Sequence, residues 1–244
     1  MRLAVAGGTG MVGSRIVALA RAAGHEARLL SRSQGVDLTR PGALDLSGVD
    51  VVIDASGTKT TAAAKSRAFF RAVSEELLRA GAAAGVRHHV VLSIVGAADA
   101  PHGYYAGKAE QERIVEASRV PWTILRATQF FEFADQVAVP MGPFAVVPAM
   151  RSQPLAAESV ARRLMEIAEG APLGLAPDIA GPEEMRMAEL ARAVRAARGQ
   201  RGRVFELPLP GGLGRALREG AILPGPEAQL LGPRFEQWLS AQAV

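Results

Sequence analysis

The chain has 244 residues and no cysteine, which excludes disulfide bonds, thiolate nucleophiles, thiolate zinc sites and iron–sulfur clusters. Histidine is also scarce. His25 and His102 stand alone, and the adjacent His88 and His89 would point to opposite faces of an extended strand. No metal-ligand spacing is visible, so we expect no metal site.

Long apolar runs and one-sided charge are missing as well. No run reaches the roughly 18 apolar residues of a membrane span, and the first apolar stretch lacks the character of a secretory signal. The 28 Lys and Arg residues are scattered among 24 Asp and Glu residues, without a long basic block. We therefore expect a cytoplasmic protein that binds neither membranes nor nucleic acid.

The first half of the chain alternates short apolar runs with longer helical stretches. This rhythm predicts a Rossmann-type doubly wound parallel sheet, an α/β fold with helices on both faces. A further strand at 36–38 would be very short, because Pro41 and Gly42 interrupt the segment. The expected strands cover residues 3–6, 27–30, 49–54, 89–93 and 122–126.

After about Pro140 the alternation stops, because proline and glycine recur every few residues. Helices are expected near 157–169 and 182–197, and Phe235 and Trp238 would dock a last helix onto the body. We expect no self-sufficient sheet here. The prediction is a nucleotide-binding domain over 1–140, and a small, mostly helical region over 141–244 that covers the substrate.

A glycine-rich loop follows the first strand and opens the first helix. Gly7 permits a tight turn, Gly10 lets the backbone approach a pyrophosphate, and Gly13 allows close helix packing. Free amides and the helix dipole favour phosphate at such a helix start. The expected phosphate-binding residues are Gly7, Thr9, Gly10, Met11, Val12 and Gly13.

The end of the second strand predicts which dinucleotide binds. An acid there would accept the ribose hydroxyls of NAD(H), whereas this chain places Arg32 between Ser31 and Ser33. Arginine pairs well with a 2′-phosphate, so NADP(H) is favoured over NAD(H), although Arg32 could also be one more exposed arginine. The turn Asp54, Ala55, Ser56 and Gly57 after the third strand would pass beside the adenine ribose.

Tyr104 and Lys108 stand four residues apart in a helical segment and so share one face. A lysine ammonium lowers the pKa of a nearby phenol and can also hold the nicotinamide ribose. Ser93 ends a predicted strand at the edge where parallel sheets bind ligands, and could polarise a carbonyl. Tyr105 is the competing phenol.

Four segments carry a resemblance to a known family: Gly7-Gly-Thr-Gly-Met-Val-Gly13, Leu92-Ser-Ile-Val-Gly96, Tyr104-x-x-x-Lys108 and Pro121-Trp-Thr-Ile-Leu-Arg-Ala-Thr-Gln-Phe130. Together they resemble the atypical short-chain dehydrogenases/reductases of the NmrA-like, NAD(P)H-binding kind. The resemblance implies a Rossmann fold with NADPH on the glycine loop, and Ser93, Tyr104 and Lys108 at the catalytic positions. Where the family usually has a proline near the nicotinamide, this chain reads Arg126-Ala-Thr-Gln129, so Thr128 and Gln129 would supply polar contacts.

The leading hypothesis is an NADPH-dependent reductase in which Tyr104 donates a proton to a carbonyl or quinone-like acceptor. Phenylalanines around 130–144 could line an apolar substrate pocket or simply form core. The NmrA-like group also contains proteins that sense the redox state of the dinucleotide without turning it over, so a non-catalytic NADP(H) sensor is the alternative. A sugar-nucleotide epimerase or dehydratase is a third hypothesis. A homo-oligomer is possible in each case.

Overall fold

The apolar runs form one parallel sheet in the computed structural model, which describes residues 1–142, 144–200 and 202–242. The strands are β1 (Arg2–Ala6), β2 (Glu26–Leu30), β3 (Val51–Asp54), β4 (His88–Ile94), β5 (Trp122–Ala127), β9 (Gly174–Leu175), β10 (Ile179–Ala180) and β13 (Gln229–Leu230). Across the sheet the order is β13-β10-β5-β4-β3-β1-β2, and β9 pairs with β5. All five strands expected in the first half are present, with ends that differ by about two residues at most, the usual uncertainty of such boundaries.

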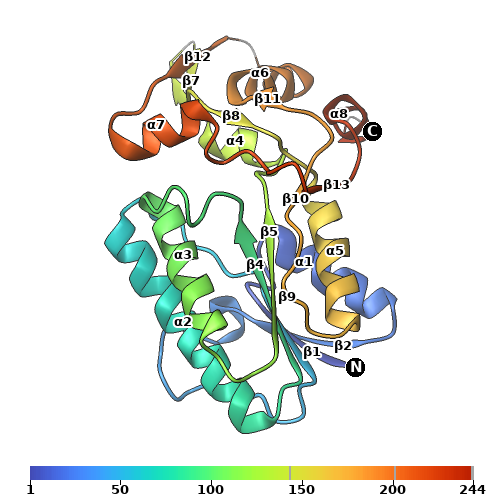
Figure 1. Ribbon diagram of the computed structural model, residues 1–244. Helices are drawn as coiled ribbons and strands as arrows, with labels where there is room; N and C mark the ends of the chain where they lie inside the picture. Colours follow the sequence, from blue (N-terminus) through green and yellow to red (C-terminus); the bar gives the residue numbers. More distant parts are fainter. Residues whose placement is uncertain (143, 201, 243–244) are drawn as a thin grey trace.

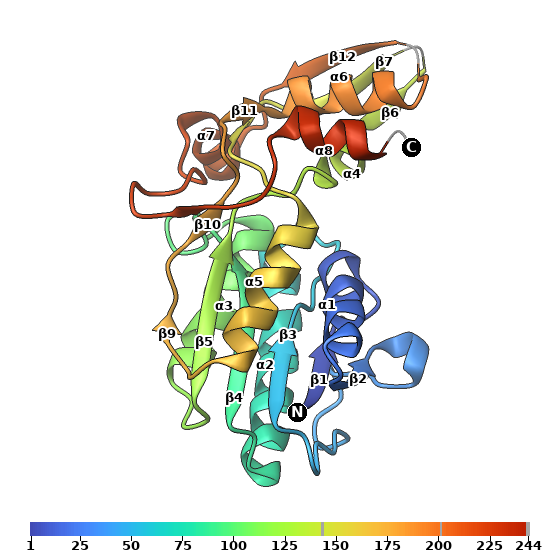
Figure 2. The ribbon, with the colours of Figure 1, turned by 90° about the vertical axis from the view of Figure 1, so that its right-hand side faces the viewer.

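Helices cover both faces of this sheet. Helices α1 (Met11–Ala22) and α5 (Ala157–Glu169) lie on one face, and α2 (Ala63–Ala84) and α3 (Gly103–Glu116) lie on the other (Figures 1 and 2). The Rossmann-type class predicted from the sequence is therefore confirmed. The carboxyl ends of the strands point toward a smaller upper region (Figure 2).

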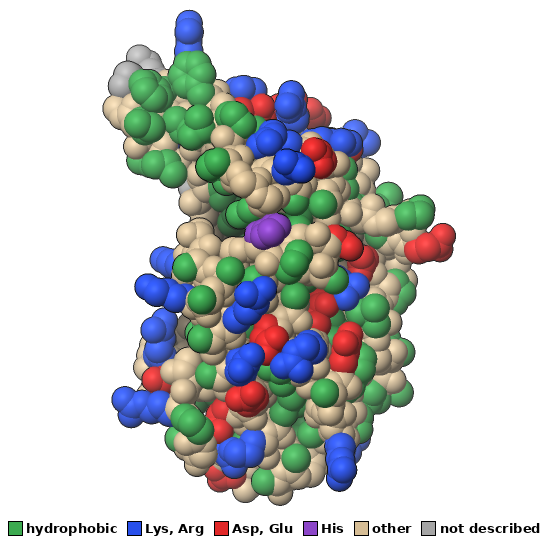
Figure 3. Space-filling view, turned by 60° about the vertical axis from the view of Figure 1, so that its left-hand side comes forward, with side chains coloured by type: hydrophobic (Ala, Val, Ile, Leu, Met, Phe, Trp, Pro, Cys, Tyr) green, Lys and Arg blue, Asp and Glu red, His purple; other side chains and the backbone are tan. Residues whose placement is uncertain are grey.

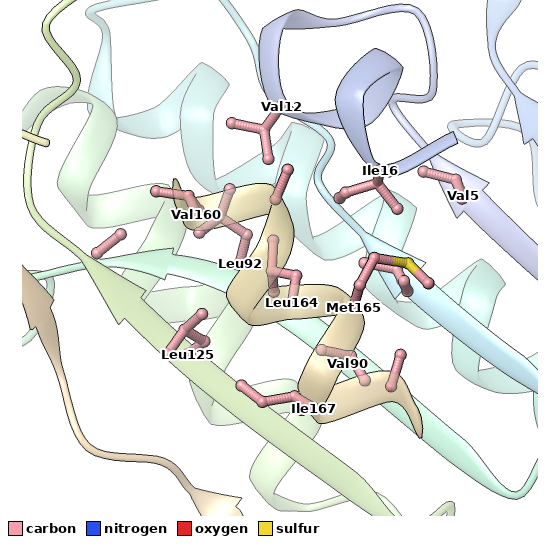
Figure 4. Packing of buried hydrophobic residues seen from close by; sticks show 14 of the residues in the cluster. Val5, Val12, Ile16, Val90, Leu92, Leu125, Val160, Leu164, Met165 and Ile167 are labelled. Atoms are coloured by element: carbon pink, nitrogen blue, oxygen red, sulfur yellow. The ribbon is translucent and has the colours of Figure 1, made fainter. Parts of the chain in front are cut away.

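The α1–α5 face holds the largest apolar core. Ile16 lies one helical turn beyond Val12 on α1, and both pack with Leu164 of α5 against Val90 and Leu92 of β4 (Figure 4). Full burial of a side chain of this kind contributes about 1.5–3 kcal/mol. This packing fixes α1, and with it the glycine-rich loop, on the sheet.

The sheet reverses its winding at β1, whose neighbours are β2 on one side and β3 on the other. The short strand considered at 36–38 does not form. After β2 the chain makes a short 3₁₀ helix, η1 (Arg32–Gln34), and then turns. The amides of Gly42 and Leu44 donate to the Glu76 carboxylate at 2.8 Å instead of to a strand.

The upper region differs from the expectation, because it contains sheets of its own. Strand β7 (Phe144–Pro148) pairs with β6 (Val139–Met141) and, in parallel, with the distant β12 (Arg203–Leu207). A pairing between segments so far apart leaves no local signal. The other elements there are α4 (Phe133–Val137), β8 (Arg151–Ser152), β11 (Met185–Arg186), α6 (Met187–Ala197), α7 (Gly211–Glu219) and α8 (Phe235–Gln242).

Residues after 140 do not all lie in the upper region. Helix α5 packs on α1, and β9, β10 and β13 extend the central sheet. The upper region has a separate core, in which the Phe131 ring lies 5.3 Å from that of Phe235 and 5.2 Å from that of Trp238. The predicted docking of the last helix by Phe235 and Trp238 is thus confirmed.

The surface on the α2–α3 side mixes charges of both signs over the lower body, while apolar side chains gather on the upper region (Figure 3). The exposed large apolar side chains of the upper region include Val139, Met141, Phe205 and Leu207. Within the described residues, no helix is long and apolar enough to cross a membrane. No cluster of three His, Asp or Glu side chains is placed to hold a metal ion in this part of the chain.

Candidate cofactor and reaction site

The glycine-rich loop links β1 to α1 at the carboxyl edge of the sheet. Gly7 has φ +71°, and a Cβ on it would lie 2.6 Å from the Ala55 carbonyl oxygen. A Cβ on Gly13 would collide with the Gly7 carbonyl oxygen at 2.1 Å. Both positions therefore require glycine, as the spacing predicts.

Gly10 is the exposed glycine at the start of α1. It precedes α1, and a Cβ there would meet only the Gly7 carbonyl oxygen, at 3.1 Å. Helix α1 has no side-chain cap and no acid in its first turn, so its first amides are available to an anion. Thr9 is exposed, while the Val12 side chain lies in the core and offers only its backbone amide.

The tip of β2 carries Ser31, Arg32 and Ser33. The two serine hydroxyls lie 2.9 Å apart, and the Arg32 side chain is exposed. Asp37 is close enough for charge coupling: hydrogen bonds from Thr39, and then the nearby Arg40 and Arg32, lower the pKa of its carboxyl group. The ion pair of Asp37 is with Arg40, at 3.5 Å.

The turn after β3 holds Asp54, Ala55, Ser56 and Gly57. The Asp54 carboxylate is fully buried and accepts from the Ser56 amide at 2.9 Å and from Gln111 Nε2 at 2.8 Å. The Ser56 hydroxyl is buried without a hydrogen-bond partner, whereas Gly57 is exposed. The backbone of this turn, rather than the Asp54 side chain, borders the loop at Gly7.

Tyr104 lies in the first turn of α3 and reaches this same turn. A Cβ on Gly57 would be 3.5 Å from the Tyr104 hydroxyl, and the Tyr104 ring packs edge-on against Phe70 at 5.4 Å. Within the described residues the hydroxyl has no hydrogen-bond partner. Burial, and then the Asp54 carboxylate, raise the pKa of Tyr104. This direction is opposite to the lowering by Lys108 expected from the sequence.

Lys108 is buried and makes three polar contacts. Its Nζ donates to the Leu92 carbonyl oxygen at 2.7 Å, to Gln111 Oε1 at 2.8 Å and to the Ser56 carbonyl oxygen at 3.5 Å. It also lies 4.4 Å from the centroid of the Phe70 ring. Burial lowers the pKa of Lys108 to about 8, although Asp54 and Glu112 oppose the shift.

Ser93 is engaged by a charged network on the α3 side of β4. Its hydroxyl donates to Glu112, and the same carboxylate forms a two-bond ion pair with Arg126 of β5 at 2.9 and 2.7 Å. Ser93 is only 3% exposed. It therefore faces α3 in this structure and makes no hydrogen bond to Tyr104.

Thr128 and Gln129 continue from β5 toward the upper region. Thr128 Oγ1 donates to the Gln153 carbonyl oxygen at 2.6 Å, and Gln129 Nε2 donates to the Tyr105 hydroxyl at 3.2 Å. Gln129 Oε1 is buried without a partner. Tyr105 thus belongs to the core of the upper region, away from the face of α3 that carries Tyr104.

The structure brings the Tyr104 hydroxyl and Lys108 Nζ to the turn after β3 and places Ser93 in a separate network. The sequence argument missed Gln111 and Glu112. A signal was present, because they follow Lys108 by three and four residues and therefore share its helical face. Their partners, Asp54 and Arg126, come from other strands, which spacing along the chain does not show.

A glycine loop at the switch point of a doubly wound sheet is typical of nucleotide-binding proteins. The chain matches the NAD(P)H-binding family over residues 35–169, more than half of its length, and it belongs to that family. The exposed Gly10, the uncapped start of α1 and the unpartnered Ser56 hydroxyl fit such a cofactor. No curated protein matches the chain in sequence.

Solved structures similar to the chain share its fold. A short-chain dehydrogenase/reductase superfamily protein from Agrobacterium tumefaciens with bound NAD has 18% identity and TM-score 0.71, covering 100% of this chain and 96% of that one. The Thermus thermophilus UDP-glucose 4-epimerase complex with NAD has 19% identity and TM-score 0.65, covering 99% and 93%. An NAD-dependent NDP-hexosamine 5,6-dehydratase of tunicamycin biosynthesis has 14% identity and TM-score 0.76, covering 100% and 96%.

Proposed function

We propose that the protein is an NADPH-dependent oxidoreductase that reduces a carbonyl or quinone-like small molecule, with Tyr104 as proton donor. The observation that carries the proposal is the Tyr104 hydroxyl, which has no hydrogen-bond partner in the described structure and lies beside Gly57. Ser93 and Lys108, by contrast, are already bonded to protein groups. Tyr104 is the group free to meet a substrate oxygen.

The raised pKa of Tyr104 keeps the phenol protonated, although it also makes the phenol a weaker acid, so donation depends on stabilising the phenolate that forms. A phenol that stays protonated at neutral pH holds a proton ready for donation, and burial favours this neutral form. When bound, NADPH supplies the hydride that forms the new C–H bond. As the carbonyl π bond breaks, the Tyr104 proton goes to the oxygen, and solvent then restores the phenol.

Lys108 would stabilise the phenolate that remains after this transfer. Its ammonium lies on the Tyr104 face of α3, and the contact to the Ser56 carbonyl oxygen, at 3.5 Å, is its longest. We propose that this loosely held proton is the one available to a ribose hydroxyl. Ser93 would orient the acceptor oxygen after turning its hydroxyl away from Glu112.

The preference for NADP(H) would come from Arg32, aided by the hydroxyls of Ser31 and Ser33. The backbone of Gly7, Thr9, Gly10, Met11, Val12 and Gly13 would bind the phosphates. The turn from Asp54 to Gly57 would border the adenine ribose, and Thr128 and Gln129 the nicotinamide end. The unpartnered Gln129 Oε1 supports the last assignment.

The decisive experiment compares wild-type protein with Tyr104→Phe during NADPH oxidation by quinones, aldehydes, ketones and a sugar nucleotide. We expect Tyr104→Phe to lower kcat by about 10²–10⁴-fold while NADPH affinity is retained. The adjacent Tyr105→Phe is the matched control and should keep its activity. Equal turnover by wild type and Tyr104→Phe would reject the proposed acid.

Cofactor choice is tested by Arg32→Ala. Loss of a charge-assisted contact to the 2′-phosphate should weaken NADPH binding by about tenfold or more and leave NADH binding unchanged. NADH serves as the internal control for folding. If the affinities for NADPH and NADH fall together, or neither changes, Arg32 does not select the cofactor.

The second candidate function is a non-catalytic NADP(H) sensor. The hydrogen bonds of Ser93 and Lys108 favour it, because two of the three expected catalytic groups are already bonded to other protein groups. Tight NADPH binding without turnover of any tested substrate would support this function over the reductase.

A further inference from the structure

Four residues form a closed ring of hydrogen bonds beneath α3. Lys108 Nζ contacts the Ser56 carbonyl oxygen, and the Ser56 amide donates to Asp54 Oδ1. Gln111 Nε2 donates to Asp54 Oδ2, and Gln111 Oε1 accepts from Lys108. Asp54 and Gln111 are fully buried, and Lys108 is 3% exposed, so water does not replace these contacts.

The charges of Lys108 and Asp54 determine how the Gln111 amide is oriented between them. An ammonium can only donate and a carboxylate can only accept, so the Gln111 amide must turn its oxygen to Lys108 and its nitrogen to Asp54. A flipped amide would set two donors against each other at Lys108 and two acceptors at Asp54. Gln111 therefore has one allowed orientation.

The ring joins two parts of the site that come from different elements. Asp54 and Ser56 belong to β3 and the turn after it, whereas Lys108 and Gln111 belong to α3. Tyr104 lies one helical turn before Lys108, and the Phe70 ring of α2 contacts both Tyr104 and Lys108. A change in the ring would thus move the ammonium relative to the phenol and to the turn.

We propose that Gln111 is a positioning residue, which holds the Lys108 ammonium between α3 and the turn after β3 by bridging it to Asp54. The inference rests on the proposed function, because Lys108 matters to catalysis only if Tyr104 is the acid. Nothing in the reductase assignment itself requires a glutamine at this position.

The charges that face Lys108 come from two elements: Asp54 of β3 and Glu112 of α3 raise its pKa, and burial lowers it more. Removing the Gln111 oxygen takes away one acceptor from the ammonium, so Gln111→Met should lower the pKa of Lys108 further. Asp54→Asn removes a carboxylate and should act in the same direction.

The double variant Asp54→Asn/Gln111→Glu provides the sharp test. The new amide at position 54 keeps an oxygen for the Ser56 amide and offers an NH₂ group to position 111. The new carboxylate at position 111 can accept from both that NH₂ group and Lys108. All four links are restored with the same total charge, although the carboxylate now sits on α3. The pKa of Lys108 should return to the wild-type value or rise above it.

The first readout does not depend on turnover. The chain contains only Lys59, Lys65 and Lys108, so ¹³Cε-lysine NMR of the full chain with NADPH follows Lys108 directly, with the exposed Lys59 and Lys65 as references. We expect Gln111→Met to shift the Lys108 midpoint down by about one pH unit. Glu110→Gln, on the neighbouring residue of α3, should leave it unchanged.

The second readout is the pH profile of kcat for an active substrate. The alkaline limb should move down by the same amount in Gln111→Met and recover in the double variant, with little change in KM. An unchanged Lys108 midpoint in Gln111→Met overturns the proposal. A shifted midpoint with an unmoved alkaline limb also overturns it, since Gln111 would then be only structural. An inactive wild type rejects the reductase function, while the NMR titration still decides whether Gln111 holds Lys108.

Discussion

The two faces of the central sheet are built differently. Under α1 and α5, strands β1, β3, β4 and β5 present apolar side chains such as Val5, Ile53, Val90 and Leu125. Under α2 and α3 the same strands also bury apolar residues such as Val52, Val91 and Ile124, but they add polar ones. The buried polar group on this face comprises Asp54, His89 and Ser93 of the strands, with Lys108, Gln111 and Glu112 of α3.

The difference shows that this fold buries charged groups on the α3 face of the sheet, where their desolvation costs free energy. Polar groups buried in protein require partners, and replacing an ion pair with apolar residues is often neutral or stabilising. The buried polar group on the α3 face is therefore poorly explained by stability alone. It lies on the face that carries Tyr104, and this agrees with a role in chemistry there.

The largest stability loss is expected on the apolar face. Leu164→Ala removes a fully buried side chain between α5 and the sheet and should lower the free energy of unfolding by about 4 kcal/mol, through lost burial and the cavity left behind. Urea denaturation measures the change. The matched control is Leu175→Ala, at a half-exposed leucine, which should cost less than about 1 kcal/mol.

On the polar face, Glu112→Gln should cost about 3 kcal/mol, because Arg126 loses its charged partner and Ser93 loses a strong acceptor. Glu116→Gln on the exposed side of α3 is the control for the same substitution. If Glu112→Gln unfolds at the wild-type urea concentration, the buried network does not stabilise the fold and the contrast between the faces is wrong.

Low pH should lower the free energy of unfolding by weakening the contacts of Glu76 with the segment between β2 and β3. The Arg79 guanidinium, with the amides of Gly42 and Leu44, lowers the pKa of Glu76 from 4.5 to about 2. Stability from Glu76 is therefore present above about pH 4.5 and lost as the pH falls toward 2, amounting to about 2 kcal/mol after allowing for the half-exposed Arg79. Glu76→Gln, compared with wild type across this range, should show a shallower decline.

A wild type and a Glu76→Gln variant that lose stability in parallel between pH 4.5 and 2 would contradict this assignment. The comparison is made at each pH because other carboxylates titrate in both proteins.

The smallest effect is expected for charge at the surface. Arg71 of α2 pairs with Glu110 of α3 at 2.8 Å, but its side chain is 54% exposed. Arg71→Ala should change the free energy of unfolding by less than about 1 kcal/mol, and added salt should shrink even that difference. If Arg71→Ala loses as much stability as Glu112→Gln, burial does not explain the different contributions of the Arg71–Glu110 and Arg126–Glu112 ion pairs.

Much of the fold was predictable because its signals are local. Runs such as residues 122–126 and the glycines from Gly7 to Gly13 carry their pattern within a few residues, and the observed β5 and loop match them. The sheet of the upper region was not predictable in this way. Strands β7 and β12 pair across more than fifty intervening residues, and each is only five residues long.

The candidate site was predictable in its residue types but not in its contacts. The spacing of Tyr104 and Lys108 correctly placed both on one face of α3. Linear spacing could not reveal that Asp54 faces Gln111, that Ser93 faces Glu112, or that burial would raise the pKa of Tyr104. Both the contacts and the pKa shift depend on which strands α3 covers in the folded protein.

The order of strands across the sheet has a consequence for synthesis. Strand β5 lies at the middle of the chain, but its outer edge is covered by the later strands β9 and β10, and β13 follows only near the carboxyl terminus. In a nascent chain leaving the ribosome, β5 would be an open edge until β9 and β10 emerge. Open edges invite pairing between chains. Translation past residue 180 therefore supplies the strands that cover the outer edge of β5, and β10 stays open in turn until β13 emerges.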